Sequence, residues 1–190
     1  RQYANLEKLF APVKDKVLFL CENGALVKYR GETLYLDPIA DDCLKDALDE
    51  IRALPDLYPM LCGADYAYIE NNEMPFFRYA MLSYTNCKKV ENLDAVIGKE
   101  PVCKIAVYDL RGAEHNSFAA VRGRLGPRLK ATLSGEQWID LMGGSNTGTA
   151  LAPLQQRPPP LPDEAEAFRA PFNHLQDLAR CFRRCAAPTA

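Results

Sequence analysis

The sequence predicts an α/β protein whose middle part is of the α+β type. A short continuous apolar run at residues 17–21 is typical of a strand buried on both faces, as in a parallel sheet. Strand and helix patterns then follow one another in mixed order, which suits α/β at the two ends and α+β between them. With 190 residues, the chain is long enough for one ordinary domain or for a compact core with an insert.

The N-terminal segment predicts a helix and then a hairpin. Residues 2–10 carry apolar side chains at helical spacing, and Pro12 ends that helix. After the apolar run, Asn23-Gly24 predicts a tight turn because both residues tolerate a positive φ. Residues 25–36 contain two short apolar segments around a central turn, which predicts a hairpin.

Two further helices are expected to begin at polar residues. Asp41-Asp42 caps an amphipathic helix with a regular apolar stripe, and Pro55 stops it. Asn116-Ser117 caps the second helix in the same way. The strand patterns lie at residues 58–62, 64–70, 102–109, 129–133 and 137–142. The aromatic-rich residues 71–86 fit a helix pattern and a strand pattern equally well.

Composition excludes several classes of protein. The net charge is −2, which argues against a general binder of nucleic acid, since that would need a basic surplus. No apolar run approaches the ~18 residues of a membrane span, so we expect no membrane partner. The seven cysteines are scattered and odd in number, which indicates reduced thiols in a cytoplasmic protein.

Five stretches, taken in order and spacing, resemble the Cof-type branch of the haloacid dehalogenase (HAD-like) phosphatase superfamily. Cys21-Glu22-Asn23-Gly24-Ala25-Leu26-Val27 is similar to the Asn-Gly-Ala turn that follows a core strand in that family. Residues 1–6 are similar to the helix that follows the family's second motif, and residues 134–142 to the strand that re-enters the core. Residues 146–151 resemble the third motif, and residues 162–164 and 168–178 resemble the approach to the fourth motif and its site.

The resemblance implies a partial HAD-like Rossmann-type core with an inserted α+β cap domain. Residues 1–37 would be the N-terminal part of the core, residues 38–134 the cap, and residues 135–190 a degenerate C-terminal part of the core. It also implies Mg²⁺-dependent hydrolysis of a small phosphorylated metabolite, with a sugar phosphate as the expected substrate. In such chemistry an aspartate attacks phosphorus, while a metal, a lysine and N–H groups offset charge repulsion.

The chain departs from the family pattern at the catalytic positions. The nucleophile motif Asp-x-Asp-Gly-Thr belongs upstream of Arg1 and is absent from the sequence. Thr147 stands at the lysine of the third motif, and Arg169-Ala170 stands at the Gly-Asp of the fourth. A threonine cannot replace a phosphate-neutralising ammonium group. We therefore expect no catalytic residue and no metal ligand in this chain, which would be inactive as it stands.

A few site residues remain, each with two interpretations. Asn23 and Gly24 are either turn formers only or part of the rim of the substrate site. Asn173, the one residue of the fourth motif that matches, is either a helix N-cap or a phosphate contact. Tyr66 and Tyr68 either belong to the cap core or line a surface that faces a sugar.

Three hypotheses stay open. The first is a phosphatase-family polypeptide shown without its catalytic strand. The second is a non-catalytic cap module that binds a sugar or a protein partner. The third is an incomplete gene product without a function of its own. Loss of the central strand would expose apolar edges at residues 17–21 and 139–142, which would favour pairing with another chain, so a homodimer is conceivable.

Overall fold

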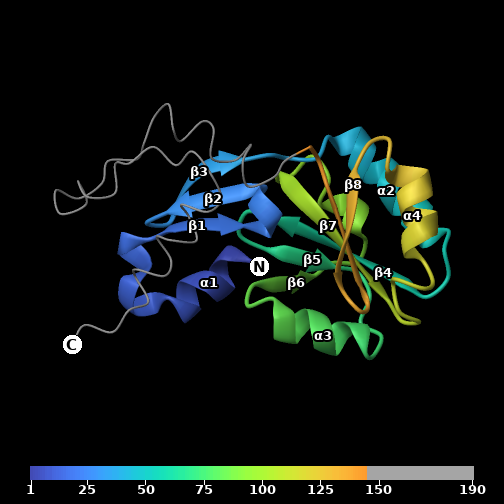
Figure 1. The fold of residues 1–190 in the computed structure, drawn as a ribbon, viewed down its shortest axis with the longest axis horizontal. Helices are drawn as coiled ribbons and strands as arrows, with labels where there is room; N and C mark the ends of the chain where they lie inside the picture. The colour runs from blue at the N-terminus through green and yellow to red at the C-terminus, as the bar shows by residue number, and fades with distance from the viewer. Residues whose placement is uncertain (145–190) are drawn as a thin grey trace.

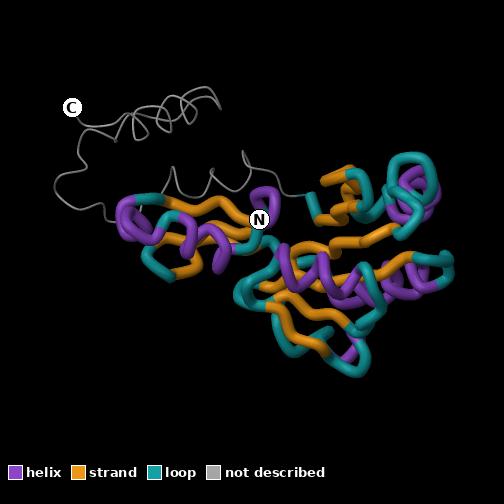
Figure 2. Tube along the Cα trace, turned by 90° about the horizontal axis from the view of Figure 1, so that it is seen from below, coloured by secondary structure: helices purple, strands orange, loops and turns teal. Residues whose placement is uncertain are grey.

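The computed structural model describes residues 1–144, and these residues form two sheets that lie side by side (Figures 1 and 2). One sheet has three strands in the order β1-β2-β3, and the other has six in the order β6-β5-β4-β7-β9-β8. Helices cover the sheets, so the α/β class predicted from the sequence is confirmed.

The three-stranded sheet is built by the N-terminal residues. Its elements are α1 (Tyr3–Leu9), the 3₁₀ helix η1 (Ala11–Lys16), β1 (Leu18–Cys21), the 3₁₀ turn η2 (Glu22–Gly24), β2 (Leu26–Tyr29) and β3 (Glu32–Leu36). The first helix and the β2–β3 hairpin lie where the pattern predicted them. A small buried cluster that includes Tyr3, Phe19 and Leu26 holds α1 on this sheet.

The expectation of a parallel, doubly buried first strand is wrong for the described residues. Among residues 1–144, β1 pairs only with β2, and the pairing is antiparallel. Its side chains alternate between half-buried and buried positions. The half-buried Leu18 and Leu20 are as apolar as their buried neighbours, so the run of residue types hides the alternation.

The six-stranded sheet occupies the middle of the chain. Its strands are β4 (Leu57–Gly63), β5 (Ala67–Ile69), β6 (Cys87–Lys89), β7 (Val102–Asp109), β8 (Lys130–Gly135) and β9 (Trp138–Met142). The helices of this part are α2 (Asp41–Arg52), α3 (Phe76–Ser83), η3 (Leu93–Ala95) and α4 (Phe118–Leu125). All neighbouring strands are antiparallel except β5 and β6, which α3 connects as a parallel pair.

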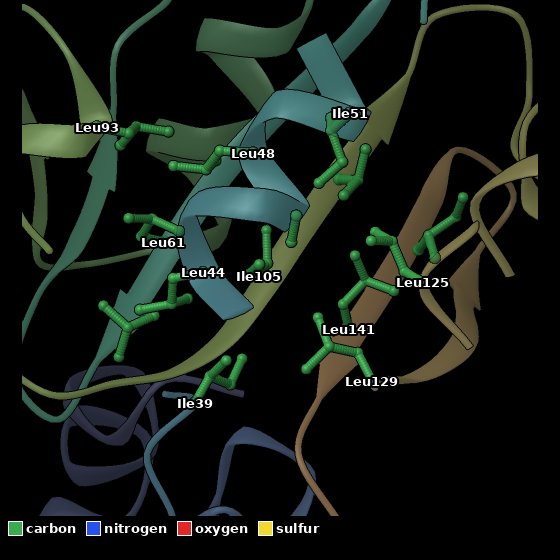
Figure 3. Packing of buried hydrophobic residues seen from close by; sticks show 14 of the residues in the cluster. Ile39, Leu44, Leu48, Ile51, Leu61, Leu93, Ile105, Leu125, Leu129 and Leu141 are labelled. Carbon is green, nitrogen blue, oxygen red and sulfur yellow. The ribbon is translucent and has the colours of Figure 1, made fainter. Parts of the chain in front are cut away.

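The two faces of this sheet are covered differently. Helices α2 and α4 lie on one face, where Leu48 and Ile51 pack with Leu61, Ile105 and neighbouring side chains in the largest buried cluster (Figure 3). Helix α3, which has eight residues like α4, lies on the opposite face and buries only Phe76 and Ala80 of its own residues (Figure 1). This one helix leaves part of the face for the three-stranded sheet to approach.

The last described strand does not belong where the sequence analysis placed it. Residues 134–142 were expected to re-enter the core, but β9 lies between β7 and β8 in the six-stranded sheet. The expected boundary at residues 134 and 135 therefore falls inside the β8–β9 hairpin. Residues 139–142 are paired on both sides, so they offer no free edge to a second chain.

Both expected helix caps differ in detail from the structure. Ala40 is the residue before α2, and Asp41 and Asp42 lie inside its first turn, where their charge favours the positive end of the helix dipole. Ser117 does precede α4, but its hydroxyl donates to buried Asp109 and not to the helix. Asn116 also donates to Asp109, so both side chains anchor a loop.

Replacing a buried leucine of α2 should strongly destabilise this part of the molecule. We expect Leu48→Ala, at a fully buried position, to lower the free energy of unfolding by about 2–5 kcal/mol, because it leaves a cavity between α2 and the sheet. Urea unfolding measures the change. The exposed Leu9→Ala is the control and should cost below about 0.5 kcal/mol. Equal losses for the two variants would contradict the packing described.

Candidate functional site

A cavity of about 450 Å³ opens where the two sheets meet. Arg1, Gln2, Asn5 and Asn23 line it from the side of the three-stranded sheet. From the six-stranded sheet and α3, the lining includes Ser83, Tyr84, Lys104, Ser134, Trp138 and Asp140. The wall is therefore rich in hydrogen-bond donors and acceptors, and it contains two aromatic rings, those of Tyr84 and Trp138.

The turn after β1 carries one side of the cavity. Glu22, Asn23 and Gly24 all have positive φ angles, of 45°, 56° and 96°. Gly and Asn adopt this region readily, whereas a glutamate there costs roughly 1–2 kcal/mol. The turn directs the side chains of Glu22 and Asn23 towards the six-stranded sheet, where both find partners.

Lys104 and Asp140 carry the opposite side because of strand alternation. In β7, Ile105 and Val107 join the cluster under α2, so Lys104 points to the α3 face. In β9, Ile139 does the same, which turns Asp140 to the α3 face as well. Both charged residues are nevertheless buried, at 4% and 5% exposure, because the three-stranded sheet covers them.

Three of the buried charged residues, Glu22, Lys104 and Asp140, form one cluster across the two sheets. Lys104 Nζ lies 2.6 Å from Glu22 Oε2 and 3.6 Å from Asp140 Oδ2, and it donates to the hydroxyl of Tyr84 at 3.3 Å. Asn23 Nδ2 donates to Asp140 Oδ2 at 2.8 Å. Glu22 is 1% exposed, and among the described residues neither of its oxygens has a partner in hydrogen-bond geometry.

The surroundings keep the lysine protonated. Burial by itself lowers the pKa of Lys104. Negative charge on the surrounding groups has the opposite and larger effect, so the pKa lies well above its ordinary value; these groups are Cys62, Glu22, Tyr84 and Asp140. Burial also raises the pKa of Cys62 to about 12 and that of Tyr84 well above 10. Glu22 and Asp140 are the acidic side chains that face the ammonium group.

Two side-chain amides of the first helix segment clamp the far wall of the cavity. Gln2 Nε2 donates to the carbonyl of Asn86 at 2.9 Å, and Gln2 Oε1 accepts from the N–H of Asn86 at 3.0 Å. Asn5 makes the same kind of pair, donating to Ser83 O and accepting from the N–H of Thr85, both at 2.8 Å. These contacts hold the segment after α3 against the three-stranded sheet.

The residues predicted from the sequence meet different outcomes. Asn23 lines the cavity, and Gly24 is the buried third residue of the left-handed turn. Asn173 lies outside the described residues, so its two interpretations are not separated. Tyr68 is buried and its hydroxyl contacts Glu100, whereas the more exposed Tyr66 lies under the ammonium group of Lys88.

Sequence reasoning missed the three buried charges. A signal was present in the sequence. Lys104 is the only charged residue within the apolar part of β7, and Asp140 is the only charged residue of β9. Charged residues inside strands are almost never fully buried unless they are paired. That signal marks each residue as unusual, but it does not say which partner each one meets.

The described residues do not fit the magnesium ion that the resemblance implies. Between residues 1 and 144, no three His, Cys, Asp or Glu side chains gather as a metal-binding group. The two carboxylates of the buried charge cluster, Glu22 and Asp140, share an ammonium group, which is already the cation between them. Mg²⁺ prefers near-octahedral oxygen ligands, and this cluster does not provide them.

Comparison with known families identifies the class of protein. The model of the haloacid dehalogenase-like hydrolases matches residues 1–157, which is most of the chain. The chain therefore belongs to this family of hydrolases, as the resemblance of its motifs suggested. No curated protein matches it.

Solved structures share the fold. A protein from Eubacterium rectale superimposes with a TM-score of 0.73 at 24% identity, over 83% of this chain and 60% of the other. A haloacid dehalogenase-like hydrolase from Bacteroides thetaiotaomicron gives 0.65 at 16%, covering 80% and 58%. A HAD subclass IIB sugar phosphatase gives 0.56 at 12%, covering 77% and 56%. The chain thus spans about 60% of the length of these relatives.

Removing the lysine of the charge cluster should be costly for stability. We expect Lys104→Met to lower the free energy of unfolding by about 3–5 kcal/mol, because it leaves Glu22 and Asp140 buried without their cation. The double variant with Glu22→Gln should lose less, since one orphaned charge is gone. Urea unfolding of both variants, with exposed Lys45→Met as control, measures the coupling. Strictly additive losses would contradict the ion pair.

Proposed function

We propose that this chain is the leaving-group-recognising part of a HAD-like phosphomonoesterase that acts on a small phosphorylated metabolite, with a sugar phosphate as the preferred class. The observation that carries the proposal is the cavity between the two sheets, which pairs the ammonium group of Lys104 with the carboxylate of Asp140 beside Trp138. Family membership supplies the hydrolase class, and one structural relative is named as a sugar phosphatase.

The chemistry of the wall suits a polyhydroxylated ligand. A sugar hydroxyl both donates and accepts, so it can bridge an acceptor such as Asp140 and a donor such as Lys104 or Asn23. Asp140 Oδ2 already accepts from Asn23, whereas Oδ1 accepts no hydrogen bond from the described residues. Trp138 offers an apolar surface to the carbon atoms of a ring. Lys104, Trp138 and Asp140 are held by strands and Asn23 by the turn η2, which favours a preformed site.

The hydrolytic step itself requires groups that lie outside the described part. A carboxylate nucleophile must approach an anionic phosphorus centre, and cations must offset the repulsion. The printed sequence has no Asp-x-Asp-Gly-Thr, so we propose that these 190 residues by themselves do not turn over substrate. Mg²⁺ enters this proposal only through the family.

Further properties of the complete protein belong to the same proposal. We place it in the cytoplasm, with a small metabolite and neither nucleic acid nor a membrane as its partner. The five described cysteines form no disulfide with one another, which agrees with a reducing compartment. None of the helices between residues 1 and 144 has the length and hydropathy needed to cross a bilayer. A homodimer stays a proposal.

Ligand binding can be tested with defined probes. We expect glucose 6-phosphate to raise the melting temperature more than glucose or inorganic phosphate does at the same concentration. A ligand that fills the cavity binds the folded protein more tightly, and tighter binding to the folded state raises the melting temperature further. Asp140→Asn should reduce that shift, whereas the exposed Asp42→Asn should not. If glucose and glucose 6-phosphate act equally, the cavity is that of a sugar-binding module and the phosphatase proposal fails.

Turnover can be tested directly. The 190-residue chain with Mg²⁺ and p-nitrophenyl phosphate should release p-nitrophenol no faster than a heat-inactivated sample, because the nucleophile motif is missing from the sequence. The absorbance of p-nitrophenolate reports the rate. Magnesium-dependent turnover above that background would show that the chain has a nucleophile which the sequence analysis did not recognise.

A further inference from the structure

We propose that Glu22 is a positioning residue of the cavity: its carboxylate, buried behind the wall, holds the ammonium group of Lys104 charged and in place to donate to a ligand oxygen. Glu22 itself does not line the cavity, whereas Lys104 does. The proposal assigns Glu22 a role that the turn alone does not require. Its consequence for ligand affinity rests on the proposed function, but its consequence for Lys104 does not.

The geometry of the turn supports this role. A glutamate with a φ of 45° is unfavourable, and the adjacent Asn23 and Gly24 tolerate that region far better. The strained conformation places a carboxylate 2.6 Å from Lys104 Nζ at a position with 1% exposure. A residue needed only for the turn would not have to be charged or buried, so the strain is offset by the contact with the lysine.

The partners of Lys104 leave room for a ligand. The ammonium group has three N–H donors, and Tyr84 accepts from one of them. Glu22 is its nearest anion, while Asp140 lies farther away at 3.6 Å and is shared with Asn23. With Glu22 behind it and Asp140 beside it, Lys104 keeps donor capacity on the side where it lines the cavity.

All the titratable groups that face Lys104 come from four other elements or segments. They are Glu22 on η2, Cys62 on β4, Tyr84 after α3 and Asp140 on β9. The neighbouring Cys103 on β7 is also buried, and burial raises the pKa of its thiol well above the ordinary value. The two thiols and the phenol are therefore neutral in the range where a ligand would bind. Among the described residues, Glu22 is the acidic side chain closest to Lys104.

The first experiment follows Lys104 without any ligand. In the 190-residue chain labelled with ¹³C-lysine, the Cε resonance that Lys104→Met removes identifies the group. We expect Glu22→Gln to move the titration of this resonance to lower pH than in the wild type, because the nearest anion is gone. The exposed Glu91→Gln should leave it unchanged. An unchanged midpoint in Glu22→Gln overturns the proposal.

A second substitution guards against misfolding at the strained turn. Glu22→Asn also removes the charge, but asparagine adopts positive φ more readily than glutamine does. Both variants should lower the midpoint in the same direction, and Glu22→Asp, which keeps the charge, should lower it less. If Glu22→Asn folds and leaves the midpoint at the wild-type value, the turn and not the charge explains Glu22, and the proposal is wrong.

The last experiment asks whether Glu22 acts through Lys104. With glucose 6-phosphate as the probe, calorimetry should show about a ten- to hundredfold loss of affinity in Lys104→Met, since a charged donor is lost. Glu22→Gln should lose affinity mainly as pH rises, and adding it to Lys104→Met should cause no further loss. Independent, additive losses would overturn the role. No binding by the wild type would contradict the proposed function, while the lysine titration would still decide the role of Glu22.

Discussion

The arrangement of the molecule depends on a buried ion cluster that joins its two sheets. Glu22 comes from the turn after β1, whereas Lys104 and Asp140 come from the middle and the last described strand of the other sheet. Such charges lose their hydration, and this loss is tolerated only while each charge keeps its partner. The cluster therefore constrains both the left-handed turn and the position of the six-stranded sheet beside it.

The contacts between the two sheets are mostly polar. Besides the ion cluster, the amides of Gln2 and Asn5 pair with main-chain groups near Thr85, and Lys28 pairs with Asp65. Polar interfaces of this kind are typical of contacts between two parts of one chain. Because the cavity is lined from both sides, a ligand in it stabilises their association, and that association strengthens ligand binding by the same factor.

Family membership and cavity chemistry address different parts of the reaction. Membership in the haloacid dehalogenase-like hydrolases is the basis of the proposed class of reaction, which would depend on a nucleophile and cations near phosphorus. The cavity presents a carboxylate, an ammonium group, amides and an indole ring, which suit recognition of hydroxyl groups. The ammonium, carboxylate and indole groups come from β7 and β9, whose pairing fixes them in register, whereas the amides come from η2 and the segment of α1.

Local patterns determined much of this protein in advance. The apolar stripe of α2, the alternation in β7 and the Asn23-Gly24 turn could be predicted, because helix period, strand period and φ preference act over a few residues. Only the tertiary structure decided that β9 joins the six-stranded sheet and that Lys104 is buried against Glu22. The first outcome depends on β7–β9 pairs such as Lys104 and Met142, which lie 38 positions apart, and the second on Glu22 and Lys104, which lie 82 positions apart. The helix and strand periods act over a few residues, so they do not tell which distant residue will pair with a buried charge.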